Sequence, residues 1–120
     1  MSVYKPGIAS GCSNGRGIKV VQTGSPGTTI HTAVSGTDEN VVDEVYIYAY
    51  NGHTDVVTLT LQLGGTTSPD DDCVVNLASK SGEQMLIPGY RFNNSVVIKA
   101  YASVANVIVI RCIVNHITNS

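Results

Sequence analysis

Residues 41–63 read VVDEVYIYAYNGHTDVVTLTLQL, two long runs of alternating side chains on either side of Asn51-Gly52. A type I′ hairpin turn requires positive φ at both of its central residues, and the Asn-Gly pair tolerates that conformation best. The pattern therefore predicts two strands, over 41–50 and 54–63, that pair antiparallel through a tight turn.

The two runs differ in the side chains on their second faces. In 54–63 the aliphatic residues alternate with Thr and Gln, which is typical of a strand with one core face and one wet face. In 41–50 they alternate with Tyr46, Tyr48 and Tyr50. Tyrosine rings bury well while their hydroxyls stay wet, so this row is covered either by the chain's own loops or by a subunit or partner. Because large apolar surfaces usually mark interaction sites, the partner contact is favoured.

Short β-rich runs separated by turn residues continue along the chain at intervals of about ten residues, the spacing of a sandwich or barrel. Val and Ile supply 17 and 10 of the 120 residues and Leu only five, a bias that favours strands over helices. The remaining strands are expected near 18–23, 28–34, 73–78, 84–87, 95–101 and 105–116. We predict an all-β fold, an antiparallel β-sandwich of jelly-roll-like arrangement.

The first 17 residues differ from the rest of the chain. They are rich in Gly and Ser, include Pro6, and show almost no apolar periodicity. We expect an irregular N-terminal arm over 1–17 that lies outside the core. Because 120 residues fit one domain, the β-sandwich domain is expected to fill 18–120.

The last predicted strand, 105–116, is apolar on both faces. Val107, Val109 and Ile113 occupy the face opposite the expected core face, interrupted by Arg111. A small two-layer protein has no third layer to cover such a face. We therefore predict that these three aliphatic residues form an oligomer contact.

Composition excludes several partners. Hydrophobic residues make up 42% of the chain, charged residues 13%, and the net charge is −2, so the chain is not disordered and has no cationic surplus for nucleic-acid phosphates. The sequence contains neither a signal-peptide pattern nor a run of about 18 apolar residues. We expect a soluble protein made in the cytoplasm, with no nucleic-acid or membrane partner.

Residues that could carry chemistry are scattered. Cys12, Cys73 and Cys112 are far apart and lack zinc-ligand spacing, so free thiols are favoured over a metal site or a disulfide. Segment 11–17 is Gly-rich but lacks the Lys-Ser or Lys-Thr of a phosphate-binding loop, and 70–72 lacks the spacing of a calcium loop. Hydrogen-bonded or surface roles are expected for the isolated histidines His31, His53 and His116. We predict no cofactor, no metal and no enzymatic activity.

The second half of the chain carries a family resemblance. Ile87-Pro88-Gly89, the segment SVVIKAYASVANVIVI at 95–110, and Val114-Asn115-His116-Ile117 resemble small β-sandwich virion proteins of tailed bacteriophages, among them capsid decoration (cement) proteins. The resemblance covers about a quarter of the chain, roughly 85–117, and its motifs are structural.

This resemblance implies a structural role. Such proteins typically form trimers on the exterior of the expanded head and bridge neighbouring subunits of the major capsid protein. The expected location is thus the virion, and the expected state a homotrimer. We expect the arm, through Tyr4, Lys5 and Arg16, and the tyrosine row to bind the capsid protein.

Two alternatives remain open from the sequence. The first is a neck, tail or fibre-associated virion protein built on the same sandwich. The second is a carbohydrate-binding β-sandwich that uses the tyrosine row as a sugar platform, which the absence of Trp makes less attractive.

Overall fold

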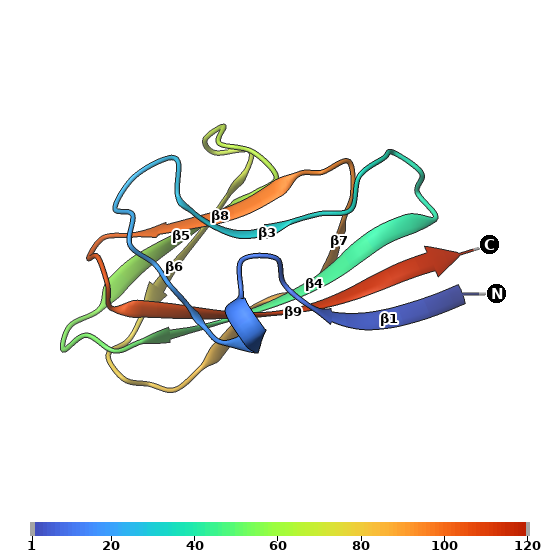
Figure 1. Cartoon of the computed structure of the whole chain (residues 1–120). Helices are drawn as coiled ribbons and strands as arrows, with labels where there is room; N and C mark the ends of the chain where they lie inside the picture. Colours follow the sequence, from blue (N-terminus) through green and yellow to red (C-terminus); the bar gives the residue numbers. More distant parts are fainter. Residues whose placement is uncertain (1, 120) are drawn as a thin grey trace.

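The computed structural model describes residues 2–119, and two antiparallel sheets pack face to face in it (Figure 1). Strands make up 55% of the structure, and the only helical element among these residues is a single 3-10 turn, Ser13–Gly15. The predicted all-β sandwich is confirmed. The molecule is elongated, with extents of 48 × 27 × 21 Å, and β1 begins at the same end at which β9 finishes.

Apart from one hairpin in the second sheet, the strands that lie side by side in each sheet are not consecutive in the chain. The first sheet has the order β1 (Ser2–Ile8), β9 (Ile108–Asn119), β4 (Val41–Asn51) and β7 (Gln84–Phe92), and β2 (Ile18–Lys19) pairs with β9 beside β1. The second sheet has the order β3 (Thr28–Thr32), β8 (Val97–Ala102), β5 (Val57–Leu63) and β6 (Asp72–Leu77).

The strand order is that of a jelly roll. The hairpin of β5 and β6 lies innermost in the chain, and the antiparallel pairs β4 with β7, β3 with β8, and β1 with β9 enclose it in turn. Folding this long nested hairpin over itself produces two facing layers, each with four of the paired strands, and the short β2 adds a fifth strand to the first layer. This is the jelly-roll arrangement. The topology thus agrees with the jelly-roll-like prediction.

The core lies between the sheets and follows the alternation of the strands. Val45, Ile47 and Ala49 of β4 are completely buried, and so are Leu59 and Leu61 of β5. Aliphatic residues of the other strands, mainly β3, β8 and β9, add to the core. Each β4 tyrosine therefore points away from the core, as the sequence pattern predicted.

The predicted pairing of 41–50 with 54–63 was wrong. β4 pairs with β7 and β9, whereas β5 belongs to the opposite sheet. Neither Asn51 nor Gly52 has positive φ. Asn51 is instead buried, and its side-chain amide donates to the carbonyl oxygens of Asp55 and Leu77. The Asn-Gly pair therefore forms a corner that carries the chain between sheets, because both edges of β4 are already paired.

The predicted irregular arm was wrong for residues 2–8, which form β1 and extend the first sheet along β9. Residues 9–17 are mostly irregular but contribute to the core, because Ala9 and Cys12 are buried. The sequence missed β1 because Pro6 and Gly7 weaken strand propensity, and Pro is tolerated only at a sheet edge such as this one.

Candidate functional site

The candidate site is the side of the first sheet that faces away from the second sheet, called the outer face below. Strand register places side chains from five strands on it: Tyr46 lies opposite Ile113, Tyr48 opposite Arg111, and Ile113 in turn opposite Ile8. The outer face includes Tyr4, Ile8, Lys19, Glu44, Tyr46, Tyr48, Tyr50, Met85, Val109, Arg111 and Ile113.

Large apolar side chains on the outer face are open to solvent. Ile8 is 59% exposed, Tyr4 56%, Met85 51% and Ile113 49%. The tyrosines of β4 are half-buried between them. Contiguous exposed apolar surface of this kind is typical of protein interaction sites.

The Glu44 carboxylate on the outer face is held by three side chains of the same sheet. Glu44 accepts hydrogen bonds from the Tyr46 hydroxyl at 3.1 Å, from Asn115 Nδ2 at 3.3 Å and from Arg91 Nη2 at 3.4 Å. Burial raises the pKa of Glu44, but the bonds from Asn115, Tyr46 and Arg91 outweigh it and hold the pKa below its usual value of 4.5. Glu44 is therefore ionised at neutral pH, and three of its acceptor positions are already used within the chain.

A bulge in β7 provides the seat for Tyr46. Gly89 has no partner in β4, although its neighbours Pro88 and Tyr90 pair with Tyr46 and Val45, and it has φ +95°. A side chain at Gly89 would approach the Tyr46 ring to 3.1 Å. Only glycine combines this backbone conformation with this close approach, so the bulge at Gly89 makes room for the Tyr46 ring.

Two shallow hollows flank Arg111 at one end of the outer face. The first, of about 310 Å³, is lined by Gly15, Tyr48, Glu83, Arg111, Cys112 and Ile113. The second, of about 340 Å³, is lined by Arg16, Gly17, Lys19, Val109 and Arg111. Arg111 forms an ion pair with Glu83, so its positive charge is partly offset within the chain.

The structure brings most of the predicted contact residues together. Tyr4 and the three tyrosines of β4 share the outer face with Val109 and Ile113, so the predicted partner and oligomer contacts form one surface. Lys5 is separated from this set because it pairs with His116 on the opposite side of the sheet. Val107 is partly buried against the core, whereas Arg16 lies in the second hollow.

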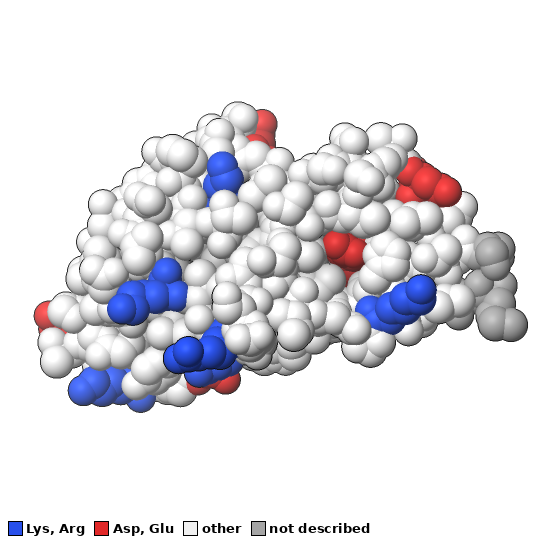
Figure 2. Space-filling model, in the orientation of Figure 1, with Lys and Arg blue, Asp and Glu red and all other residues white. Residues whose placement is uncertain are grey.

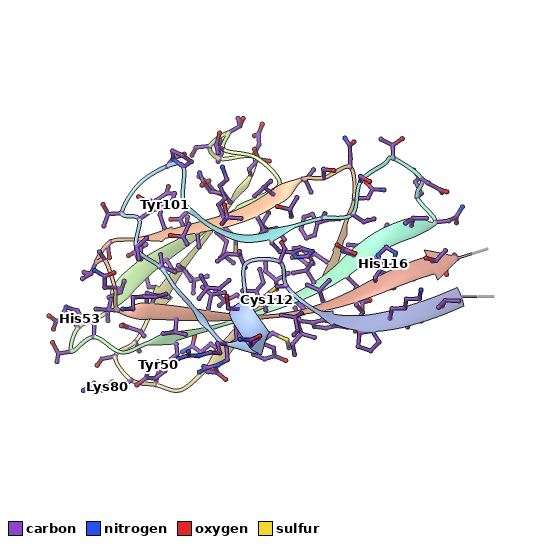
Figure 3. All side chains as sticks on the ribbon, in the orientation of Figure 1. Tyr50, His53, Lys80, Tyr101, Cys112 and His116 are labelled. Carbon is purple, nitrogen blue, oxygen red and sulfur yellow. The ribbon has the colours of Figure 1, made fainter. Side chains whose placement is uncertain are left out.

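A polar cluster that the sequence did not predict links the two sheets. Asp43 of β4 is buried and accepts hydrogen bonds from His31 Nε2 of β3 and His116 Nδ1 of β9, each at 2.9 Å, and from the Val34 backbone N–H at 3.0 Å. Burial raises the pKa of Asp43, but the bonds from His116, His31 and Val34 lower it below its usual value of 3.8. His116 lies toward the end of the molecule where β9 finishes (Figure 3).

Ser10 extends this cluster into the order Ser, His, Asp. Its Oγ lies 3.2 Å from His31 Nδ1, but the same ring nitrogen accepts the Ser10 backbone N–H at 3.0 Å. Ser10 Oγ also accepts the Thr32 N–H at 2.8 Å. A catalytic triad needs a histidine nitrogen free to accept the serine proton and a site for substrate beside it, and neither hollow is lined by Ser10. We interpret the row as an anchor that ties the 9–17 segment to both sheets.

The cysteines are free thiols, and two of them are buried. Cys12 and Cys112 each contribute to the core cluster, while Cys73 is half-buried on β6. Burial, together with the nearby Cys12, raises the pKa of Cys112 to about 12. Cys112 is therefore a protonated, weakly reactive thiol at neutral pH. It lies midway along β9 (Figure 3).

Within residues 2–119, no three metal-binding side chains gather into a group that could hold an ion, and no helix is long and apolar enough to cross a membrane. Comparison with known proteins found no matching family model, no matching curated protein and no matching solved structure.

Proposed function

We propose that this chain is a virion structural protein, a capsid decoration protein that docks through its outer face onto the major capsid protein. The observation that carries the proposal is the exposure of Tyr4, Ile8, Met85 and Ile113, from three strands, on one continuous side of the first sheet. Burying such side chains against a partner is the dominant favourable term in protein association.

The rigidity of the outer face supports docking. β4 and β9 pair along eleven consecutive positions at the centre of the sheet, and Glu44 fixes the Tyr46 hydroxyl while Gly89 seats its ring. A preordered surface loses little conformational freedom on binding, so more of its interaction energy remains as affinity.

Binding of this kind stabilises the partner by mass action. A protein that binds only the mature capsid lattice favours that lattice over the states it does not bind. A homotrimer would present three outer faces and multiply weak contacts through effective concentration. The proposal places the protein at the capsid exterior in many copies, whereas a neck, tail or fibre protein would be present in few.

Binding to heads that lack the protein tests the proposal. Replacing Tyr48 and Ile113 together by Ser is expected to weaken head binding at least a hundredfold, because central aromatic and aliphatic anchors carry most of the energy of an interface. The matched control is Val74→Ser on β6, which removes a valine that is 61% exposed but lies on the other sheet. Equal binding by the double variant and wild type would overturn the proposal, as would an equal loss in the control.

The N-terminal strand offers a second test. All described side chains of β1 from Val3 to Ile8 are exposed, whereas Ala9, Ser10 and Cys12 hold the next segment in place. Deleting residues 1–8 should therefore weaken head binding and leave the sandwich folded, which circular dichroism would verify. Deleting 1–17 would remove core residues as well and would confuse binding with folding.

A further inference from the structure

The outer face is apolar along most of its length but ends in a group of cations. Arg16, Lys19 and Arg111 surround the hollow of about 340 Å³ beside Val109. Among residues 2–119, Arg16 and Lys19 form no ion pair, and Arg111 pairs only with Glu83. Figure 2 shows several blue Lys and Arg groups at the lower left with red Asp or Glu atoms beside them, and Figure 3 labels Lys80 in the same region.

Tight backbone packing sets the position of these cations. A Cβ at Gly17 would lie 2.5 Å from Val109 Cγ1, so only glycine allows the chain to cross β9 this closely. β2 then pairs Ile18 with Ile110 and Lys19 with Val109, which buries the isoleucine and turns the lysine onto the outer face. The positions of Arg16 and Lys19, which precede and follow the crossing of β9, are thus fixed by the backbone.

The charges of the hollow call for an acidic ligand. Like charges held near one another repel, and an anion placed among them relieves that repulsion. The chain as a whole has a net charge of −2, so the local excess of positive charge is opposite in sign to that of the molecule. Three cations are too few to follow a nucleic-acid backbone.

The lining of the neighbouring hollow, of about 310 Å³, indicates what kind of molecule would bring the anionic group. It shares Arg111 and continues along the outer face over Tyr48 and Ile113. In that hollow Arg111 already binds one carboxylate, that of Glu83. An occupant that fits both hollows therefore combines a carboxylate with apolar side chains, as an acidic segment of a protein does.

We propose that the hollow formed by Arg16, Lys19 and Arg111 binds an acidic side chain of the protein that docks on the outer face. The inference rests on the proposed docking function and deepens it by giving the partner a direction: its carboxylates meet the β2 end, and its apolar residues cover Tyr48, Ile113 and Ile8. Charge complementarity at one end of an apolar face fixes orientation and speeds association.

Poly-L-glutamate, titrated into the ¹⁵N-labelled protein at physiological salt, tests the hollow directly. The expected result is a set of amide shifts confined to Arg16, Gly17, Lys19 and the strand around Arg111, with none for poly-L-glutamine. The double variant Arg16→Gln, Lys19→Gln should weaken binding roughly tenfold. The matched control Lys5→Gln, Lys99→Gln changes the net charge equally at two lysines that lie away from the hollow, on β1 and β8, and should bind as wild type.

Each other outcome overturns the inference. Shifts spread over the whole surface, or an equal loss in both double variants, would mean general charge attraction. Shifts with sodium sulfate but not with poly-L-glutamate would mean a site for small ions only. A chemically synthesised heparin fragment that binds more tightly than poly-L-glutamate would point to an acidic glycan instead of a protein.

Head binding separates this inference from the proposed function. If the Arg16→Gln, Lys19→Gln variant binds heads as tightly as wild type, the acidic contact is refuted while docking through the outer face stands. If the variant of Tyr48 and Ile113 also binds heads normally, the proposed function fails as well. Retained poly-L-glutamate binding in that second variant verifies that the hollow is intact.

Discussion

The outer faces of the two sheets have opposite characters. On the first sheet, Tyr4, Ile8 and Ile113 are about half exposed or more, and no segment of residues 2–119 covers them. On the second sheet, the corresponding strand β5 carries Thr58, Thr60 and Gln62. Val74 is the one large apolar side chain that is exposed on a strand of that sheet.

On the outer face of the second sheet, a loop of the same chain covers a polar side chain and forms hydrogen bonds with it. Gln62 is 1% exposed because the 24–27 loop lies over it: its Oε1 accepts the Gly27 N–H at 2.9 Å, and its Nε2 donates to Ser25 Oγ at 2.9 Å. A Cβ at Gly27 would lie 2.5 Å from the Ala100 backbone, so the loop is in close contact with β8. The chain therefore covers part of the outer face of the second sheet with its own loop but leaves apolar side chains exposed on the outer face of the first sheet. Exposed apolar faces of this kind usually mark interaction surfaces.

The largest expected effect is on the link that holds these two sheets together. Replacing Asp43 by Ala should lower the free energy of unfolding by about 3 kcal/mol, because the donors of His31, His116 and Val34 lose a buried charged acceptor. Chemical denaturation measures the change. Asp55→Ala is the control, since Asp55 is exposed and its loss should cost less than about 0.5 kcal/mol. Equal effects of the two substitutions would contradict the assigned role of Asp43.

A smaller effect separates the two outer faces. Gln62→Ala should cost about 2 kcal/mol of folding stability, since it leaves the Gly27 N–H and the Ser25 hydroxyl without their partner. Ile113→Ser should change stability by less than about 0.5 kcal/mol, because the side chain is already half exposed. Thermal and chemical unfolding measure both changes. A larger loss of stability for Ile113→Ser than for Gln62→Ala would contradict the difference between the two outer faces.

The sequence predicted the strands and the two-faced character of β4 but not the contacts between distant residues. Alternation fixed which side of β4 is buried, and the tyrosine row emerged on the outer face as expected. The pairing of β4 with β5 failed because the Asn51-Gly52 turn signal is local, whereas Asn51 is held by Leu77, 26 residues away. Which strand an edge pairs with depends on the whole nested hairpin.

The polar cluster was beyond prediction for a similar reason. His31 and His116 lie 12 and 73 residues from Asp43 in the chain, with no spacing that marks them as a group. Only the crossing of β3 over β4 and the pairing of β4 with β9 bring them together. A buried Asp in a strand is the single sequence signal, because a buried carboxylate requires partners.

The smallest expected effect is the pH dependence of the link at Asp43. Since the folded state holds the pKa of Asp43 below its usual 3.8, this group stabilises the fold above the unfolded-state pKa, and that contribution is lost as pH falls through the folded-state pKa. Unfolding free energies of wild type and Asp43→Asn, measured from about pH 6 to about pH 2, should therefore converge toward the acid end. A gap that stays constant over this range would show that the carboxylate charge contributes nothing, and that Asp43 joins the two sheets by hydrogen bonds alone.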